Sequence, residues 1–378
     1  MSTLAGSNSQ TRVVVRSAVS HQSDASLAVG ELVAALGQEA DLYAVFVAPG
    51  FDLAAVAAAT RAAFGDRVIG CTSAGNIGAN GYDLTGIGAI ALTGGALSAR
   101  TIALGPLDDP CAVVEENGAA IAELRAGIGD ADGFAVLLTD GLRGNEDVLT
   151  ASLMAALGDV PIIGASAGDD LTFRRTAVYY NGQFSENLAT VTVVRTDAPF
   201  RLMRVQHHEA TGTVLVATDV DPDRRIVRAI NGRPAARAYA EAVGLPVGEL
   251  TPTVFSRYPL LLNAGGTSWI RSIAEVEAHD FLRMFARVDV GDVLRLGRPQ
   301  AMLEKLGACL EGVAAELGSI GGMLVFDCIL RRLEFESEGL TGQVGALLAA
   351  HHATGFSSYG EQFNGMHMNQ TLVAVAFA

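Results

Sequence analysis

The chain has 378 residues, of which 50% are hydrophobic and 18% are charged, a balance that excludes a disordered protein and supplies a sizeable core. A formal net charge of −15 argues against nucleic acid or an anionic membrane surface as the main partner. Four scattered cysteines without a CxxC pair, and an N-terminus without an apolar signal core, predict a cytoplasmic location. The apolar runs fall short of the roughly 18 residues of a membrane-spanning helix.

Continuous apolar strands alternate with helices in the first half of the chain, which favours a sheet covered by helices. Asp52 is expected to begin a helix that ends at Phe64, and Asn145 to cap a helix that ends at Leu157. The remaining predicted elements of this half are a strand over 11–16, a helix from Ser23 or Asp24 to Leu36, strands at LYAVFVAP, RVIGCTS and TGIGAIAL, a helix over 110–125, and strands at GFAVLLTD and VPIIGAS.

After Arg175 the rhythm changes to strands at short spacing. Among them YYNGQF predicts a hairpin, because Asn-Gly accommodates the positive φ angles of a tight turn. A helix over 299–317, the strand GGMLVFDC, a helix to about His351 and two closing strands complete the chain. We therefore expect a mixed α/β fold of two packed domains, 1–230 and 231–378, each a mostly β sheet covered by helices.

Three predicted strands end in turns made of small residues. The segments GCTSAG, GASAG and GFSSYGEQFNG begin at Gly70, Gly164 and Gly355. Such a turn suits a nucleophile, a cradle for a ligand, or close packing of two backbones. Because three turns cannot all carry a nucleophile, we expect their N–H groups and hydroxyls to line one pocket between the domains. Glu361 and Asn369 would add polar specificity to that pocket.

The segment GASAG also matches the GxSxG nucleophile elbow, with Ser166 as the nucleophile. An elbow requires a helix after the serine, whereas DDLTFRRTAVYY predicts a turn followed by a strand. A serine hydrolase is therefore the less favoured alternative. Cys71 is a second candidate nucleophile, although isolated cysteines are usually small buried side chains.

The histidines lack the spacing of a helical metal site, and HExxH is absent. A strand would direct the rings of His207 and His208 to opposite faces, so that one at most faces a given site. His367, flanked by Met366 and Met368, is the candidate axial ligand of a haem b, and a histidine bonded within a turn is the alternative. The arginines of DPDRRIVRAINGR are interpreted as part of a solvated strand face.

Seven segments occur in an order typical of one family. They are GCTSAGNI…GY, DGL, GASAGDDLTF…AVYYNG, INGRPAARAY, FDCILRR, GFSSYGEQ and HMNQT. With these segments the chain resembles FIST proteins, as an N-terminal FIST domain followed by a C-terminal FIST domain over nearly its whole length. The resemblance implies a sensory, ligand-binding protein of bacterial signalling without catalytic machinery of its own.

The resemblance implies two kinds of ligand, of which haem is the favoured one and an amino-acid-like ligand the alternative. Some FIST proteins are haem-binding nitric oxide sensors that regulate histidine kinases or cyclic-di-GMP enzymes, and here His367 would ligate the haem. Other members are proposed to bind small ligands such as amino acids, and here Arg331 would pair with a carboxylate through its forked guanidinium. In both cases the output is expected to pass to a partner protein in trans, and a homo-oligomer is a further expectation.

Carried over by position, the resemblance assigns the pocket to residues of all three turns and of the FDCILRR segment. These are Cys71, Thr72, Ser73, Ser166, Asp169, Asp170, Cys328, Arg331, Tyr359, Glu361 and Asn369. Two positions depart from the pattern of many members. Asn76 stands where an acidic residue is common, and Met368 stands where a histidine precedes Asn-Gln-Thr. On a strand, the one-residue shift turns the ring of His367 to the opposite face.

Overall fold

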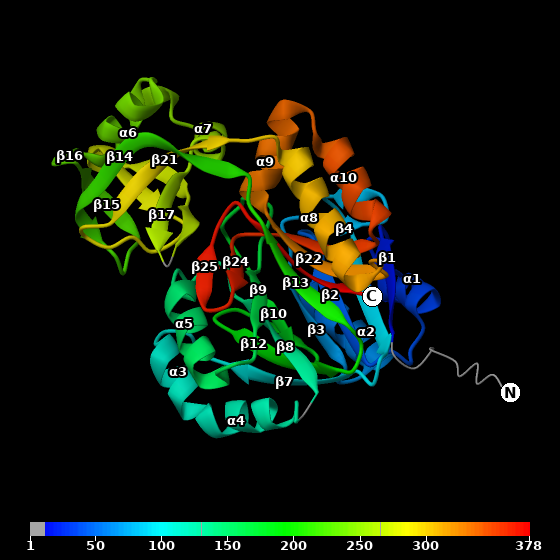
Figure 1. Cartoon of the computed structure of the whole chain (residues 1–378). Coiled ribbons are helices and arrows are strands. Elements are labelled where there is room, and N and C mark those ends of the chain that lie inside the picture. The colour runs from blue at the N-terminus through cyan, green and yellow to red at the C-terminus, as the bar shows by residue number, and fades with distance from the viewer. Residues whose placement is uncertain (1–11, 130, 265) are drawn as a thin grey trace, which may run out of the picture.

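The computed structural model describes residues 12–129, 131–264 and 266–378. These residues form four β-sheets with helices packed on them, which confirms the predicted mixed α/β fold. Three of the sheets pack together as a main body. The fourth sheet belongs to a separate lobe, which we call the inserted body (residues 208–299) and which lies at the upper left of Figure 1.

The main body consists of three consecutive units that share one order of elements: strand, helix, strand, helix, strand, hairpin, strand. Unit 1 contains β1 (Val13–Ser20), α1 (Ala25–Leu36), β2 (Leu42–Val47), α2 (Leu53–Phe64), β3 (Val68–Thr72), β4 (Asn76–Gly78), β5 (Gly81–Asp83) and β6 (Ile87–Gly94). Unit 2 contains β7 (Ser98–Leu104), α3 (Pro110–Glu116), α4 (Gly118–Ala126), β8 (Asp132–Thr139), α5 (Glu146–Leu157), β9 (Ile162–Ser166), β10 (Val178–Tyr180), β11 (Gln183–Ser185) and β12 (Ala189–Thr196).

Unit 3 follows the same order, with the inserted body placed after its first strand. It contains β13 (Phe200–Val205), α8 (Met302–Leu317), β22 (Gly322–Cys328), α9 (Ile329–Glu338), α10 (Thr341–Ala350), β23 (Ala353–Ser358), β24 (Glu361–Phe363), β25 (Met366–Met368) and β26 (Leu372–Phe377).

The inserted body is a strongly bent sheet with two α-helices. Its elements are β14 (His208–Asp221), β15 (Ile226–Ile230), β16 (Arg233–Pro234), α6 (Ala235–Val243), a short 3-10 helix (Val247–Glu249), α7 (Pro252–Arg257), β17 (Leu260–Ala264), β18 (Thr267–Arg271), β19 (Ile273–Glu277), a second 3-10 turn (Ala278–Asp280), β20 (Phe281–Met284) and β21 (Val293–Pro299). Residue 230 is the last residue of β15, and the division of the chain into domains at this residue stays a prediction.

The strand order repeats in the three sheets of the main body. Sheet 1 runs β1-β6-β2-β3, sheet 2 runs β7-β12-β8-β9, and sheet 3 runs β13-β26-β22-β23. The last two strands of each series are parallel. Each sheet is then completed by a hairpin from another unit: β10 pairs with β3, β24 with β9, and β4 with β23. The exchange of hairpins is therefore cyclic and ties the three units into one body.

The parallel strand pairs explain why the same turn sequence recurs. Gly70, Gly164 and Gly355 occupy matching positions on the third strand of each unit. A Cβ atom at these residues would lie 2.2, 2.4 and 1.6 Å from a backbone oxygen of the neighbouring parallel strand. Any side chain there would collide with backbone, so the tight approach of the two strands requires glycine.

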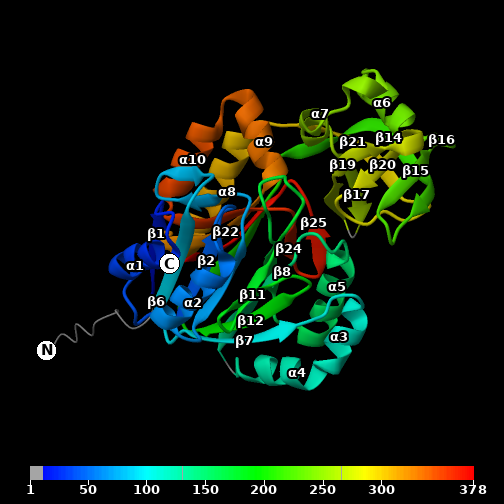
Figure 2. The same ribbon diagram turned by 180° about the vertical axis from the view of Figure 1, so that it is seen from behind.

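A central core lies between the three sheets, and helices cover their outer faces. Phe46, Phe134 and Phe326 enter the central core from sheets 1, 2 and 3. The outer faces are covered by α1 and α2 on sheet 1, by α3, α4 and α5 on sheet 2, and by α8, α9 and α10 on sheet 3 (Figures 1 and 2). Burial of each phenylalanine contributes about 1.5–3 kcal/mol, so this shared core holds the units in a fixed arrangement.

Local sequence signals predicted several boundaries correctly. Asp24 caps α1, and Asp52 caps α2 by accepting hydrogen bonds from backbone N–H groups of the first turn. Asn181 and Gly182, with φ angles of 49° and 85°, form the predicted hairpin between β10 and β11. These features depend on a few adjacent residues, which is why the sequence predicts them.

Other local predictions are wrong. The single helix expected over 110–125 is two helices that meet at Asn117, and the helix expected before His351 is interrupted at Gly339, whose φ angle is 69°. Asn145 stands at the start of α5, but its side-chain amide donates to the backbone oxygen of Leu107 and does not cap the helix. In this last case a tertiary contact replaces the local one.

Candidate functional site

The three small-residue turns meet at one place in the main body. The N–H of Gly168 donates to the oxygen of Thr72 at 3.1 Å, and the N–H of Ala74 donates to the oxygen of Ser357 at 2.9 Å. The N–H of Ser166 is bonded to the backbone of the third turn at 2.8 Å. The turns thus lie together as expected, but these N–H groups donate to backbone oxygens of the other turns and are not available as donors to a ligand.

The candidate residues of the first turn are buried and bonded within the protein. Burial raises the pKa of the Cys71 thiol well above its usual value, so the thiolate required of a nucleophile is disfavoured. Thr72 Oγ1 accepts a backbone N–H at 3.1 Å, and Ser73 Oγ donates to Asn76 Oδ1 at 3.1 Å. Burial likewise raises the pKa of Cys328, on unit 3. These side chains contribute to packing of the junction.

Ser166 ends β9 and is fully buried. Gln362 Nε2 donates to Ser166 Oγ at 3.0 Å and to His367 Nδ1 at 3.1 Å. An amide therefore stands between the hydroxyl and the imidazole, where a serine hydrolase needs direct contact for proton transfer. A loop and then β10 follow Ser166, as predicted, and not the helix of a nucleophile elbow. The geometry does not support Ser166 as a nucleophile.

His367, the candidate haem ligand, is enclosed by protein and 2% exposed. A Cβ atom on Gly360 would lie 2.3 Å from its Cε1. Because Gln362 donates to Nδ1, the ring carries its proton on Nε2, and neither nitrogen offers a free lone pair to iron. These surroundings do not fit an axial haem ligand, which needs an open side towards the metal.

Asp169 organises the loop that follows β9. Its carboxylate accepts hydrogen bonds from the backbone N–H groups of residues 173–175 and from the hydroxyl of Tyr359. Although burial opposes ionisation, these bonds hold the pKa of Asp169 below its usual value. Asp170 pairs with Arg332 at 2.7 Å. The predicted site residues Asp169, Asp170 and Tyr359 thus fix the shape of one loop.

Arg331, expected to bind a ligand carboxylate, is fully buried and bonded within the protein. Its Nε donates to Asp327 Oδ1 at 2.6 Å, and its Nη1 donates to His207 Nδ1 at 3.1 Å. The hydroxyl of Tyr82 donates to the same Asp327 carboxylate. Arg331 therefore compensates a buried acid beneath α9 and does not face solvent.

Next to Arg331 lies a cluster that the sequence analysis missed: His207, His208 and Glu334, whose potential ligand atoms lie within 4.8 Å of one another. The prediction that the two rings diverge is wrong, because His207 lies in the link between β13 and β14 and not within a strand. Burial lowers the pKa of His207 to about 2 and that of His208 to about 3, so both rings are neutral.

The hydrogen bonds of this cluster favour a metal-free network. Since Arg331 donates to Nδ1 of His207, the ring proton lies on Nε2, which donates to Glu334 at 2.9 Å. His208 Nε2 donates to the backbone oxygen of Ser256 at 3.1 Å. A metal ion would have to coordinate the nitrogen atoms that now carry these protons, in place of their hydrogen bonds.

Glu361 and Asn369 are buried where the hairpin of unit 3 enters sheet 2. Glu361 accepts from Ser358 Oγ at 2.5 Å and from Thr371 Oγ1 at 2.7 Å, and burial raises its pKa to about 8. Asn369 Nδ2 donates to the oxygen of Tyr359 at 3.3 Å, while its Oδ1 has no hydrogen-bond partner in the described part of the chain. Both residues are hydrogen-bonded to the segments that flank the hairpin of unit 3.

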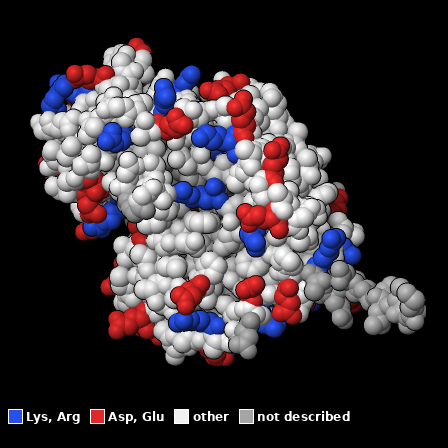
Figure 3. Space-filling view, viewed as in Figure 1, with Lys and Arg blue, Asp and Glu red and all other residues white. Residues whose placement is uncertain are grey.

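An open cleft lies between the main body and the inserted body. Its larger part has a volume of 530 Å³ and is lined by residues 141–144, Phe173, residues 223–225, Ala274, Glu275 and residues 283–285. An adjoining part of 320 Å³ shares Arg143, Gly144, Asp223 and Arg225 and adds Asp147 and Arg287, among others. Figure 3 shows basic side chains in the hollow between the two bodies, and acidic side chains dispersed over the outer surface.

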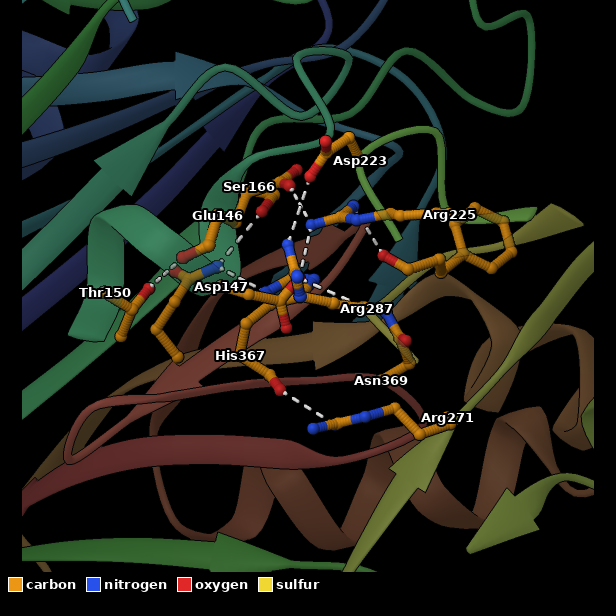
Figure 4. Close-up of polar contacts among 12 residues, drawn as sticks. Glu146, Asp147, Thr150, Ser166, Asp223, Arg225, Arg271, Arg287, His367 and Asn369 are labelled. Carbon is orange, nitrogen blue, oxygen red and sulfur yellow. Dashed lines mark hydrogen bonds and ion pairs between the residues drawn. The ribbon is translucent and has the colours of Figure 1, made fainter. Parts of the chain in front are cut away.

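Arg225 joins the two sides of this cleft. Its Nη2 lies 2.7 Å from Glu146 Oε2 and 2.6 Å from Asp147 Oδ2, at the start of α5, and its Nη1 donates to the oxygen of Phe285 at 2.7 Å. Burial opposes this cation, but the two carboxylates raise the pKa of Arg225 above its usual value. Arg287 adds a backbone N–H to Asp147 at 3.1 Å (Figure 4). The inserted body is thus held to unit 2 by a buried ionic contact.

A second contact between the bodies lies below the first in Figure 4. Arg271 of the inserted body donates to the backbone oxygen of His367 at 3.3 Å. The imidazole of His367, together with Arg225 and Arg271, offsets the effect of burial and holds the pKa of Asp147 below its usual value. The region around α5, β25 and the inserted body is therefore a shared polar interface.

Sequence reasoning missed this interface. The interpretation of DPDRRIVRAINGR as a solvated face is correct for Arg224, which is exposed, and wrong for Arg225, which is buried. Glu146 and Asp147 lie in the first turn of α5, where acidic residues are common because they complement the helix dipole. Arg225 and Glu146 lie 79 positions apart in the chain, and no local pattern links them.

Together these features define a two-lobed mixed α/β protein with an open, arginine-lined cleft between the lobes. The FIST N domain matches residues 41–233, and the FIST C domain matches residues 235–364. The chain therefore belongs to the FIST family, whose domains are sensory domains of signal transduction and are generally non-catalytic. No curated protein matches the chain. Within the described residues, no helix is long and apolar enough to cross a membrane.

Proposed function

We propose that this chain is the ligand-binding component of a bacterial signalling system, and that an amino-acid-like ligand binds in the cleft between the two bodies. The observation that carries the proposal is the position of Arg225, which lines both parts of the cleft and also holds the inserted body to α5. A ligand in the cleft changes the balance of these contacts and thereby the pose of the inserted body.

The charges around the cleft suit a ligand with a carboxylate and an ammonium group. Arg224 is exposed in the cleft wall and forms no ion pair within the described part of the chain, so its guanidinium is free for a carboxylate. Asp223 and Glu275 line the same cleft and can accept from an ammonium group. Under this proposal the pose of the inserted body is the signal, read in the cytoplasm by a histidine kinase or a cyclic-di-GMP enzyme.

A thermal-shift screen of the full chain against amino acids and the matching 2-oxo acids tests the proposal. A ligand at a hundred times its Kd raises the free energy of unfolding by about 2.7 kcal/mol, which is readily measured. Arg228→Ala alters an arginine outside the cleft lining, so the ligand should raise the free energy of unfolding of this variant as it does for the wild type. For Arg224→Ala we expect a smaller rise. Absence of any stabilising compound, or equal shifts in both variants, would overturn the proposal.

Haem-dependent nitric oxide sensing is the alternative that the family resemblance supports, and it has a separate test. Haemin is titrated into the full chain, and the absorption spectrum is recorded before and after addition of nitric oxide. A saturable Soret band at one equivalent that is lost in His367→Ala would favour this alternative. A broad band that does not saturate would remove it.

A further inference from the structure

The turn of unit 2 differs from its two counterparts in one respect. In unit 1 the turn passes directly from Gly75 to the hairpin strand at Asn76, and in unit 3 from Gly360 to Glu361. The register of the exchanged hairpins shows that Val178 is the matching position in unit 2, since Cys71, Ala165 and Phe356 face the first residue of each hairpin. Residues 170–177 are therefore an additional loop, present only in unit 2 among the three units.

This additional loop is held in a strained conformation. Asp170, Leu171 and Phe173 have φ angles of 54°, 62° and 49°, in the left-handed region that side chains other than glycine rarely adopt. Each such residue costs on the order of 1–3 kcal/mol. The carboxylate of Asp169 and the ion pair between Asp170 and Arg332 offset this cost by bonding the loop to the main body. The loop is thus built to hold one particular side chain in place.

That side chain is Phe173, which the loop presents to the cleft. The ring is 48% exposed, although the main body buries most of its other phenylalanines. Its centroid lies 5.0 Å from the ring of Tyr359 and 6.3 Å from that of Phe285 in the inserted body. Leu142 and Met284 extend the same apolar wall. An apolar surface with exposed aromatic area therefore borders the cleft from both bodies.

We propose that the ligand of this cleft is an aromatic carboxylate, whose ring stacks on Phe173 and whose carboxylate group pairs with Arg224. The inference rests on the proposed function and narrows its ligand class. An aromatic ring on an aromatic wall gains about 0.5–1.5 kcal/mol beyond simple burial, which an aliphatic chain does not. The exposed ring and the exposed cation then both find a partner in one molecule.

Calorimetric titration of the full chain with two acids of equal charge tests this assignment. The probes are phenylpyruvate, which carries an aromatic ring, and 4-methyl-2-oxopentanoate, which carries a branched aliphatic chain. We expect phenylpyruvate to bind about threefold to tenfold more tightly, the factor that corresponds to the stacking energy. Phe173→Leu should abolish the preference, Phe173→Tyr should keep it, and Arg224→Gln should weaken both acids alike. The matched control Phe184→Leu, on β11 of the hairpin that unit 2 adds to sheet 1 and outside the cleft lining, should change neither affinity.

The outcomes separate this inference from the proposed function. Equal affinity for the two acids, or an unchanged preference in a folded Phe173→Leu protein, would overturn the aromatic assignment and leave the ligand-binding cleft in place. If neither acid binds but the thermal screen finds another compound that does, the aromatic assignment is also overturned and the ligand-binding cleft stays in place. Failure of both acids together with an empty thermal screen would overturn the two proposals at once.

Discussion

The turns of units 1 and 2 begin with the same structural requirement and then diverge. In both, a glycine lets the third strand approach its parallel neighbour closely. The hairpin that follows the turn then joins the sheet of another unit. In unit 1 the turn from Gly70 to Gly75 leads directly into the hairpin, and its side chains are buried. In unit 2 the matching turn leads into the strained loop that carries Phe173 to the cleft.

The comparison separates packing from function within one chain. What the two turns share, small residues and close backbone contact, belongs to the fold. Two features belong to unit 2 alone among the three units: the loop over 170–177 and the polar contacts of α5 with the inserted body. Both features border the cleft. The repeated motif thus joins the three units, and the proposed site lies where the repetition is broken.

The largest expected effect concerns the glycine at which each of the turns begins. Gly355→Ala places a Cβ atom 1.6 Å from a backbone oxygen and should lower the free energy of unfolding by on the order of 4 kcal/mol, or prevent folding. Gly307→Ala, inside α8 where a Cβ meets open space, is the matched control and should stabilise the helix by up to about 1 kcal/mol. Denaturant unfolding measures both. Similar stability in the two variants would show that the turns do not serve packing.

The ionic contact between the bodies should give the next largest effect. Arg225→Met leaves Glu146 and Asp147 without their cation and should lower the free energy of unfolding by about 3 kcal/mol or more. Arg228→Met removes a partly exposed arginine that also pairs with two aspartates, and should cost less than about 1 kcal/mol. If both variants lose the same stability, the interface is not held together as described.

A pH dependence should follow from Glu361. Its pKa is raised to about 8 in the folded protein from a usual 4.5, so the folded state binds more protons than the unfolded state between these values. Its contribution to stability is therefore complete below about pH 4.5 and is lost as the pH rises to about 8. Glu361→Gln, which resembles the protonated acid, should gain stability relative to the wild type across this range, by about 2 kcal/mol at pH 6 and by more at higher pH.

Thermal unfolding of the wild type and Glu361→Gln at several pH values measures this effect. Because the difference between the two proteins cancels the contributions of all other groups, its slope reports Glu361 alone. A difference that stays constant from pH 5 to pH 8 would contradict the raised pKa.

The smallest expected effect concerns Ser166. Its replacement by alanine removes one acceptor of Gln362 and should cost about 1 kcal/mol of stability. We also expect that a fluorophosphonate probe does not label the wild-type protein, because Ser166 is fully buried and has no directly bonded base among the described residues. Labelling that disappears in Ser166→Ala would restore the serine hydrolase alternative.

The sequence predicts what adjacent residues determine. The caps Asp24 and Asp52, the Asn-Gly hairpin and the mixed α/β class all rest on such local patterns. The exchange of hairpins between units, and the partners of Arg225 and Arg331, depend on contacts between distant segments and have no local signature. The sequence shows that the three turns are alike and predicts that they meet. It does not reveal that the backbones of the turns are hydrogen-bonded to one another.

Amide hydrogen exchange of the full chain, with and without phenylpyruvate, tests most directly where the ligand lies. The account predicts slower exchange in residues 141–144, 170–177, 223–225 and 283–287, which border the cleft from both bodies, and no change at 70–75. Slower exchange confined to the junction of the three turns, or none at all at a saturating concentration, would contradict it.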